Sequence, residues 1–263
     1  MAPAPEEVAA WCRENEPPYF AKPFYASMPG GSMKRKNKVF RSEAELVLHA
    51  RTAGLRGVVV QRMIASGDGH VYDAYGLCNR RREVVALASH RRLRQHPPDT
   101  GATSFGEIPV IDAPELEGRI FEGTRRLLAR LSYHGIFGIE WLHEEGTGKL
   151  YLADFNARPF SSIGHLADSG LNLPLLAYRE LCGEASPGVD LYPGLHHRYW
   201  MDFNRDVRGF RERRRARGQT WGDFASDVLC CTSFAYLDVR DPGPWLRRSA
   251  DLLRILGEHM TKG

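Results

Sequence analysis

GIFGIEWLHEEGTGKLYLADFNARP, residues 135–159, is the stretch of sequence that decides the fold. Two apolar runs flank the turn sequence EEGTGK, so we expect two antiparallel strands joined as a hairpin. Asp154 and Asn156 are two residues apart on the second strand, and their side chains therefore share one face of it. A hairpin with this turn can bring Glu140, on the first strand, opposite that same face.

Three oxygen-donor side chains would then converge without a histidine or cysteine among them. Such hard ligands select Mg²⁺ or Mn²⁺, and Mg²⁺ usually keeps waters and substrate phosphates as its other ligands. Arg158 follows Asn156 by two residues and could neutralise a phosphate or hold an anionic substrate. The alternative is an acidic strand that merely faces solvent. Because Asp and Asn are disfavoured inside strands, their place in the apolar run YLADFNA favours a functional site.

Two further segments suggest contacts with a nucleotide. Lys22 lies near the end of an expected strand, before a glycine-rich loop. A lysine and backbone amides in such a place can approach phosphates. The alternative is an ordinary surface loop, since the phosphate-binding pattern GxxxxGK[ST] is absent. The strand VVVQRMI runs into a turn and could present its backbone to an adenine, with Asp68 beside the ribose. The alternative is an ordinary strand end with no role in binding.

Arginines cluster in the segment ASHRRLRQHPPDTG, before a loop that contains proline and glycine. Arg91, Arg92 and Arg94 together suit the recognition of phosphate or carboxylate. Strict alternation along a strand predicts that Arg92 and Arg94 point to the same face.

The whole chain predicts an α+β fold with antiparallel sheets, because two strand pairs are joined by short turns and regular strand–helix alternation is lacking. We expect helices over 6–16, from a cap at Ser42 to Gly54, over 114–133 and over 172–183. We expect strands in PPYFAKPF, RGVVVQRMI, HVYDAYGLC and EVVALASHRRLR, and a long loop over QHPPDTGATSFG. Beyond Leu195 the pattern is mostly helical, with room for a strand between Ser226 and Val239.

These pieces, in this order, resemble the ATP-grasp superfamily and, within it, the carboxylate–amine ligases. The segments that carry the resemblance are AKPF with PGGS, VVVQRMIASGD and the hairpin over 135–159; RRLRQHPPDTG is similar to a subgroup that includes D-aspartate ligase-like enzymes. The resemblance implies two sheet-plus-helix lobes that clamp ATP. We expect the first lobe over 1–65, the second over 66–185, and a mostly helical extension over 186–263.

The resemblance also implies a role for individual residues. ATP would be bound by Lys22, Gly30, Gly31 and Ser32 at the phosphates, Gln61 and the backbone of Met63 at the adenine, and Asp68 at the ribose. Mg²⁺ (or Mn²⁺) would be bound by Glu140, Asp154 and Asn156. Arg158 would face the transferring phosphate, and Arg94 is similar to the substrate or phosphate arginine of these ligases.

The implied activity is ATP-dependent activation of a small carboxylate as an acyl phosphate, which an amine then attacks. The sequence departs from the family pattern at Asp154, where glutamate is commoner, and in the few residues that precede Lys22, where the family usually has an α/β domain. We therefore expect either a short form, a fragment, or a protein partner or dimer that supplies the missing part. The alternative function is a non-catalytic ATP-binding subunit or one half of a split ligase.

The composition sets limits on the class of protein. The chain of 263 residues has a formal net charge of +4 and five cysteines, and no apolar run reaches the length of a membrane span. We read the cysteines as reduced thiols of a cytoplasmic protein without a membrane partner. Seven arginines between Arg205 and Arg217 make a nucleic-acid contact conceivable, but a solvated helix face paired with Asp206 and Glu212 is the favoured reading.

Overall fold

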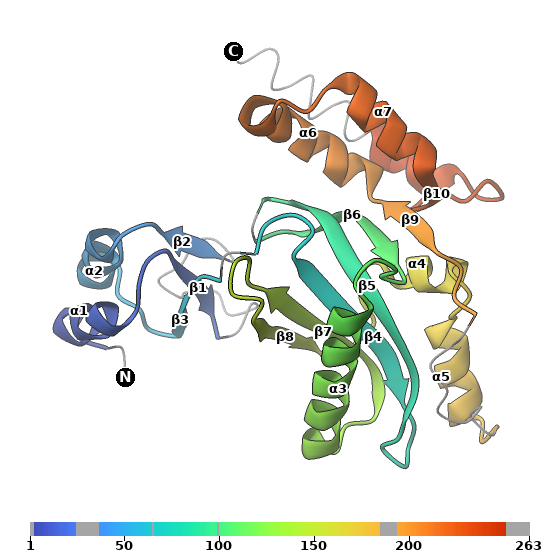
Figure 1. Cartoon of the computed structure of the whole chain (residues 1–263), viewed down its shortest axis with the longest axis horizontal. Coiled ribbons are helices and arrows are strands. Elements are labelled where there is room, and N and C mark those ends of the chain that lie inside the picture. Colours follow the sequence, from blue (N-terminus) through green and yellow to red (C-terminus); the bar gives the residue numbers. More distant parts are fainter. Residues whose placement is uncertain (1–2, 25–36, 65, 99, 185–193, 251–263) are drawn as a thin grey trace. The chain divides into compact units, whose positions relative to one another are not determined.

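The computed structural model describes residues 3–24, 37–64, 66–98, 100–184 and 194–250. The chain divides into two compact units, Met1–Ala65 and Ser66–Gly263 (Figure 1). Each unit has its own sheet and its own apolar core.

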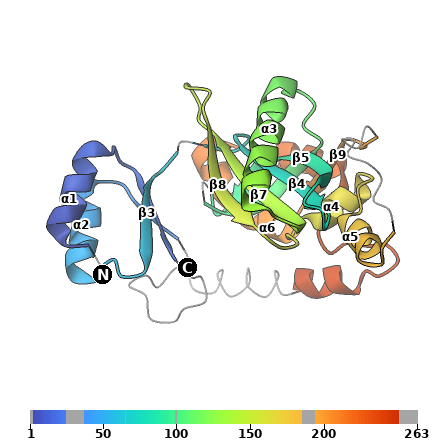
Figure 2. The ribbon, with the colours of Figure 1, turned by 90° about the horizontal axis from the view of Figure 1, so that it is seen from below.

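The first unit is a small antiparallel sheet with two helices. Its strands β1 (Tyr19–Pro23), β2 (Lys38–Phe40) and β3 (Val58–Arg62) lie in the order β2-β1-β3. Helices α1 (Pro5–Glu14) and α2 (Glu43–Thr52) lie beside each other at this sheet (Figure 2) and share its core of Val8, Cys12, Tyr19, Ala21, Phe40, Leu46 and Leu55. The cap predicted at Ser42 is confirmed, since its hydroxyl accepts a hydrogen bond from the Glu45 amide at 3.3 Å.

The second unit is built on a seven-stranded sheet in the order β10-β9-β6-β5-β4-β7-β8. The strands are β4 (Val71–Cys78), β5 (Val84–His96), β6 (Ala102–Ile108), β7 (Gly135–His143), β8 (Leu150–Asn156), β9 (Arg198–Met201) and β10 (Cys231–Phe234). All neighbouring strands are antiparallel except β9 and β10, which are parallel. The α+β fold with antiparallel sheets is thereby confirmed.

Helices cover both faces of this sheet. Helix α3 (Pro114–Leu131) packs through Ile120, Phe121 and Leu128 on one face, whereas α4 (Ile163–Asp168) and α5 (Leu173–Leu181) pack through Leu166 and Leu173 on the other. Helices α6 (Phe203–Arg217) and α7 (Trp221–Cys230) follow β9, and residues of both join a smaller core around Met201. Within the part of the chain that the structure describes, no helix is long and apolar enough to cross a membrane.

Two sequence-based expectations about elements need correction. The segment expected as a long loop contains most of β6, a buried strand between β5 and β9. Its glycine and polar residues conceal it in the sequence, because its hydrogen-bond partners come from β5 and from β9 far along the chain. The C-terminal segment is also not purely helical, since β9 and β10 extend the sheet, and β10 lies in the stretch where a strand was expected.

Candidate functional site

The β7–β8 hairpin brings together the three side chains that the sequence singled out. Glu140 lies directly opposite Asp154 in the strand register, and Gly138 lies opposite Asn156. Opposed residues of paired strands point to the same side, so Glu140, Asp154 and Asn156 share one face of the sheet, as expected. The Asn156 amide donates to Asp154 Oδ2 at 3.4 Å, which shows how close the two side chains lie.

The donor set of this hairpin fits a hard divalent cation. It offers two carboxylates and one amide oxygen, and Mg²⁺ prefers oxygen ligands while retaining several waters. Water can reach the site, because Asp154 is exposed and the Glu140 side chain is 23% exposed. Among the described residues, no group of three or more His, Cys, Asp or Glu is placed to hold a metal ion. A metal at the hairpin would therefore depend on Asn156 as its third protein ligand.

Glu140 also accepts a hydrogen bond from an arginine side chain. Arg92, on β5, donates through Nη2 to Glu140 Oε2 in a very short contact. The same guanidinium grips Asp73, on β4, with Nη2 to Oδ1 at 2.6 Å and Nε to Oδ2 at 2.9 Å. Asp73 lies directly opposite Glu140 in the β4–β7 register. Arg92 therefore bridges two carboxylates that face each other.

Burial sets the charge states of this group. Burial raises the pKa of Glu140, and the attraction of Arg92 only partly opposes that rise. Burial would also raise the pKa of Asp73, but Arg92 and the hydrogen bond from His90 hold it well below its usual value. The carboxylate of Asp73 is thus a fixed negative charge, to which Arg92 is tied.

A buried network extends from Asp73 toward the loop after β8. Asp73 Oδ2 lies 2.8 Å from His90 Nδ1 and accepts the Tyr75 hydroxyl at 3.1 Å. The same hydroxyl lies 3.1 Å from the Ser162 hydroxyl, and the Tyr75 ring stacks on Phe160 with centroids 3.6 Å apart. Phe160 and Ser162 follow Arg158 in the chain, so this network anchors the loop that carries Arg158.

Arg94 does not join this group. A bulge interrupts the β5–β6 register between Arg92 and Arg94, so that Arg92 is paired with Gly106 and Arg94 with Phe105. Consecutive residues of β6 point to opposite faces, and the two arginines follow them. The expectation that Arg92 and Arg94 share a face is therefore wrong.

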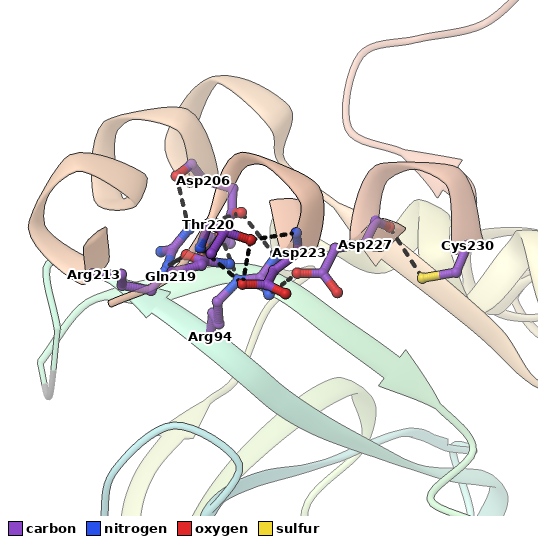
Figure 3. Close-up of polar contacts among 9 residues, drawn as sticks. Arg94, Asp206, Arg213, Gln219, Thr220, Asp223, Asp227 and Cys230 are labelled. Carbon is purple, nitrogen blue, oxygen red and sulfur yellow. Dashed lines mark hydrogen bonds and ion pairs between the residues drawn. The ribbon is translucent and has the colours of Figure 1, made fainter. Parts of the chain in front are cut away.

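The guanidinium of Arg94 donates hydrogen bonds to residues of helices α6 and α7 (Figure 3). Its Nε and Nη2 bond to Asp206 Oδ1 and Oδ2 at 3.1 and 2.9 Å, and its Nη1 bonds to Asp227 at 2.6 Å. The guanidinium also lies 4.2 Å from the centre of the Phe105 ring. These contacts dock the C-terminal helices on the sheet. The role of Arg94 at a substrate or phosphate stays a prediction.

The other predicted site residues are distributed over both units. Arg158 is exposed and donates to the Pro159 carbonyl at 2.9 Å. Asp68 belongs to the second unit, where it accepts the Gln95 amide at 3.3 Å. Lys22, Gln61 and Met63 belong to the first unit, in or just after β1 and β3, and their proposed contacts with ATP stay predictions. Gly30, Gly31 and Ser32 lie outside the described residues.

Comparisons with known proteins identify the fold. Neither protein-family profiles nor curated proteins give a match to the sequence. Solved structures do match: an ADP complex of N5-carboxyaminoimidazole ribonucleotide synthetase has a TM-score of 0.57 at 15% identity and covers 80% of this chain. The biotin carboxylase domain of Hydrogenobacter thermophilus 2-oxoglutarate carboxylase, solved with MgADP and bicarbonate, has a TM-score of 0.54 at 18% identity and covers 74% of this chain. The fold is the ATP-grasp fold.

The match to these ATP-grasp structures is partial in length. This chain covers 52% of the synthetase and 43% of the carboxylase domain, and it covers 18% of Rhizobium etli pyruvate carboxylase, which matches with a TM-score of 0.56 at 18% identity. The chain therefore spans about half or less of the proteins whose ATP-grasp fold it shares. At these identities the likeness establishes the fold, and the activity has to be argued from the site.

Asp73 is a buried residue beside this hairpin that sequence reasoning missed. It stands in the middle of the otherwise apolar strand VYDAYGLC, where aspartate is disfavoured. The same signal drew attention to Asp154 and Asn156. Applied to β4, it would have marked Asp73 as a buried charge in need of a partner, and the paired strand offers His90 directly opposite and Arg92 two residues further along.

Proposed function

We propose that this chain is an ATP-dependent ligase that activates a carboxylate as an acyl phosphate for attack by an amine. The observation that carries the proposal is the convergence of Glu140, Asp154 and Asn156 on one face of a hairpin in a chain with the ATP-grasp fold. Two of the solved structures with this fold are described as complexes with ADP and with MgADP.

The proposed chemistry has two displacements. A carboxylate oxygen of the acid attacks the γ-phosphorus of ATP, and ADP departs. The amine then attacks the carbonyl carbon of the acyl phosphate, a tetrahedral intermediate forms, and inorganic phosphate leaves while the amine loses a proton. When bound, Mg²⁺ would neutralise negative charge on the phosphates.

The residues of this chain would act by position and charge. Glu140, Asp154 and Asn156 would hold the metal at the phosphates. Arg158 is exposed beside them in the chain and would stabilise charge on the transferring phosphoryl group. Lys22 would contact the phosphates, Gln61 and Met63 the adenine, and Asp68 the ribose. No protein nucleophile is required, because the substrate carboxylate is itself the nucleophile toward ATP.

Two measurements test this proposal. The first is binding of ATP with and without Mg²⁺, and the second is release of ADP in the presence of panels of small acids and amines. Asp154→Ala and Asn156→Ala should each lower ADP release about 100-fold or more, beyond the about 10–100-fold loss typical of residues that only support a metal ligand. Glu145→Ala is the matched control, since Glu145 lies in the turn of the same hairpin and its side chain is 67% exposed.

The outcomes separate the functions. ADP release that is unchanged in Asp154→Ala and Asn156→Ala would overturn the metal assignment. Magnesium-dependent ATP binding without turnover for any pair of acid and amine would favour the alternative, a non-catalytic ATP-binding subunit or a partner-dependent half of a split ligase.

A further inference from the structure

Two acidic side chains face each other across β4 and β7, and a single arginine lies between them. Asp73 and Glu140 are direct partners in the antiparallel register. Like charges in that position repel, more strongly when water is scarce. The side chains of Asp73 and Arg92 are 3% and 11% exposed. The bridge from Arg92 to both carboxylates offsets part of that repulsion.

The guanidinium of Arg92 has little freedom to move. Asp73 takes two of its donor groups side by side, at 2.9 Å from Nε and 2.6 Å from Nη2. Such a two-pronged contact fixes both the position and the plane of the guanidinium. Asp73 is in turn fixed by His90 and by the Tyr75 hydroxyl. The strand pair β4–β5 therefore holds Arg92 as a rigid donor that points at Glu140.

That donor determines the orientation of the Glu140 carboxylate. Glu140 accepts the Arg92 contact through Oε2. A carboxylate has two oxygens, so the bond at Oε2 leaves Oε1 outside this contact, and Asp154 lies opposite Glu140 on the next strand. Without Arg92, the side chain could rotate, and the two facing carboxylates would repel each other.

We propose that Arg92, held by Asp73, is a positioning residue that orients Glu140 as a ligand for the divalent metal. The inference rests on the proposed metal and nucleotide site. It assigns Arg92 no contact with substrate. Arg92 acts through Glu140, in the way that hydrogen-bond partners behind metal ligands set their direction in other metal sites.

The experiment measures metal binding directly and does not depend on turnover. Mn²⁺ is titrated into the full-length chain at saturating ADP, and free Mn²⁺ is followed by electron paramagnetic resonance. The variants are Arg92→Met, which removes the charge, and Arg92→Lys, which keeps the charge and loses the two-pronged geometry. Arg91→Lys is the matched control: Arg91 is the neighbouring residue and pairs with the carboxylates of Glu107 and Asp112.

We expect the Kd of Mn²⁺ to rise about 10–100-fold in Arg92→Met. It should rise less, but measurably, in Arg92→Lys, and it should match the wild type in Arg91→Lys. Metal-free ADP binding should be the same in all four proteins. A merely structural role of Arg92 would lower the melting temperature and leave the Mn²⁺ affinity of the folded protein unchanged, and that result would overturn the inference.

Two further outcomes are decisive. If Arg92→Met does not fold, Arg92→Lys alone decides, and an Mn²⁺ affinity equal to that of wild type and Arg91→Lys would overturn the inference. If the wild type itself binds no Mn²⁺ with ADP, the proposed function fails and the inference fails with it. Mn²⁺ binding in the wild type that survives in Arg92→Met leaves the proposed function standing and removes only the role of Arg92.

Discussion

Replacement of Asp206 by alanine should be among the most damaging single changes in the second unit. Asp206 is fully buried at the start of α6 and accepts hydrogen bonds from four donor atoms. Three belong to arginines (Figure 3): Arg94 Nε and Nη2, and Arg213 Nη2 at 2.9 Å. The fourth is the Ser104 hydroxyl at 2.6 Å. Asp206→Ala leaves Arg94 with Asp227 as its remaining carboxylate. Arg213, which is 6% exposed, loses the carboxylate of its buried ion pair with Asp206.

The structure sets the size of the effect. Removing one partner of a buried ion pair typically costs about 3–5 kcal/mol, because the other charge stays buried and uncompensated. With a urea m-value of about 2–3 kcal/mol/M, the unfolding midpoint should fall by about 1–2.5 M. Asp206→Asn keeps the shape and one acceptor oxygen, so it should fall between Asp206→Ala and the wild type.

Urea unfolding followed by circular dichroism and tryptophan fluorescence is the assay. Asp223→Ala serves as the control, since Asp223 is an exposed acid that caps α7 in the same pair of helices. Adding Arg213→Met to Asp206→Ala should cost less than the sum of the two changes, because it removes the charge that was left unpaired. A midpoint for Asp206→Ala equal to that of Asp223→Ala would refute the reasoning.

Two further predictions follow from buried side chains. Burial lowers the pKa of His165 to about 3, below its usual value near 6.5, so its contribution to stability is full above pH 6.5 and is lost as the pH falls toward 3. Between pH 7 and pH 5 the free energy of unfolding should fall by about 2 kcal/mol through His165. In His165→Phe this part of the fall should be missing, and equal slopes of stability against pH in the two proteins would contradict the prediction. Among the five thiols, Cys182 and Cys230 are exposed and should react with an aromatic disulfide reagent in the native protein, whereas buried Cys12, Cys78 and Cys231 should react only after unfolding. Rapid reaction of a third thiol in the native protein would contradict this, because it would show that a cysteine described as buried is accessible to the reagent.

Local patterns predicted the elements whose partners lie close in sequence. The β7–β8 hairpin follows from two apolar runs around a turn, and α2 follows from the cap at Ser42. Strands β6 and β9 were beyond such reasoning, because each owes its place to distant neighbours in the sheet. Metal-ligand candidates were predictable for the same local reason, since Asp154 and Asn156 lie on one strand and Glu140 lies across one turn.

The choice between Arg92 and Arg94 shows where local reasoning fails. Both arginines sit at the end of one strand, and alternation makes them equivalent. The bulge in β5 ends that equivalence: it sends Arg92 to Asp73 and Glu140, and it sends Arg94 to Asp206, 112 residues further along the chain. A bulge depends on how β5 pairs with β6, and β6 itself was not predicted. The ligands of the proposed site could therefore be found in one hairpin, whereas the arginine proposed to orient Glu140 is selected by the pairing of four strands, β6-β5-β4-β7.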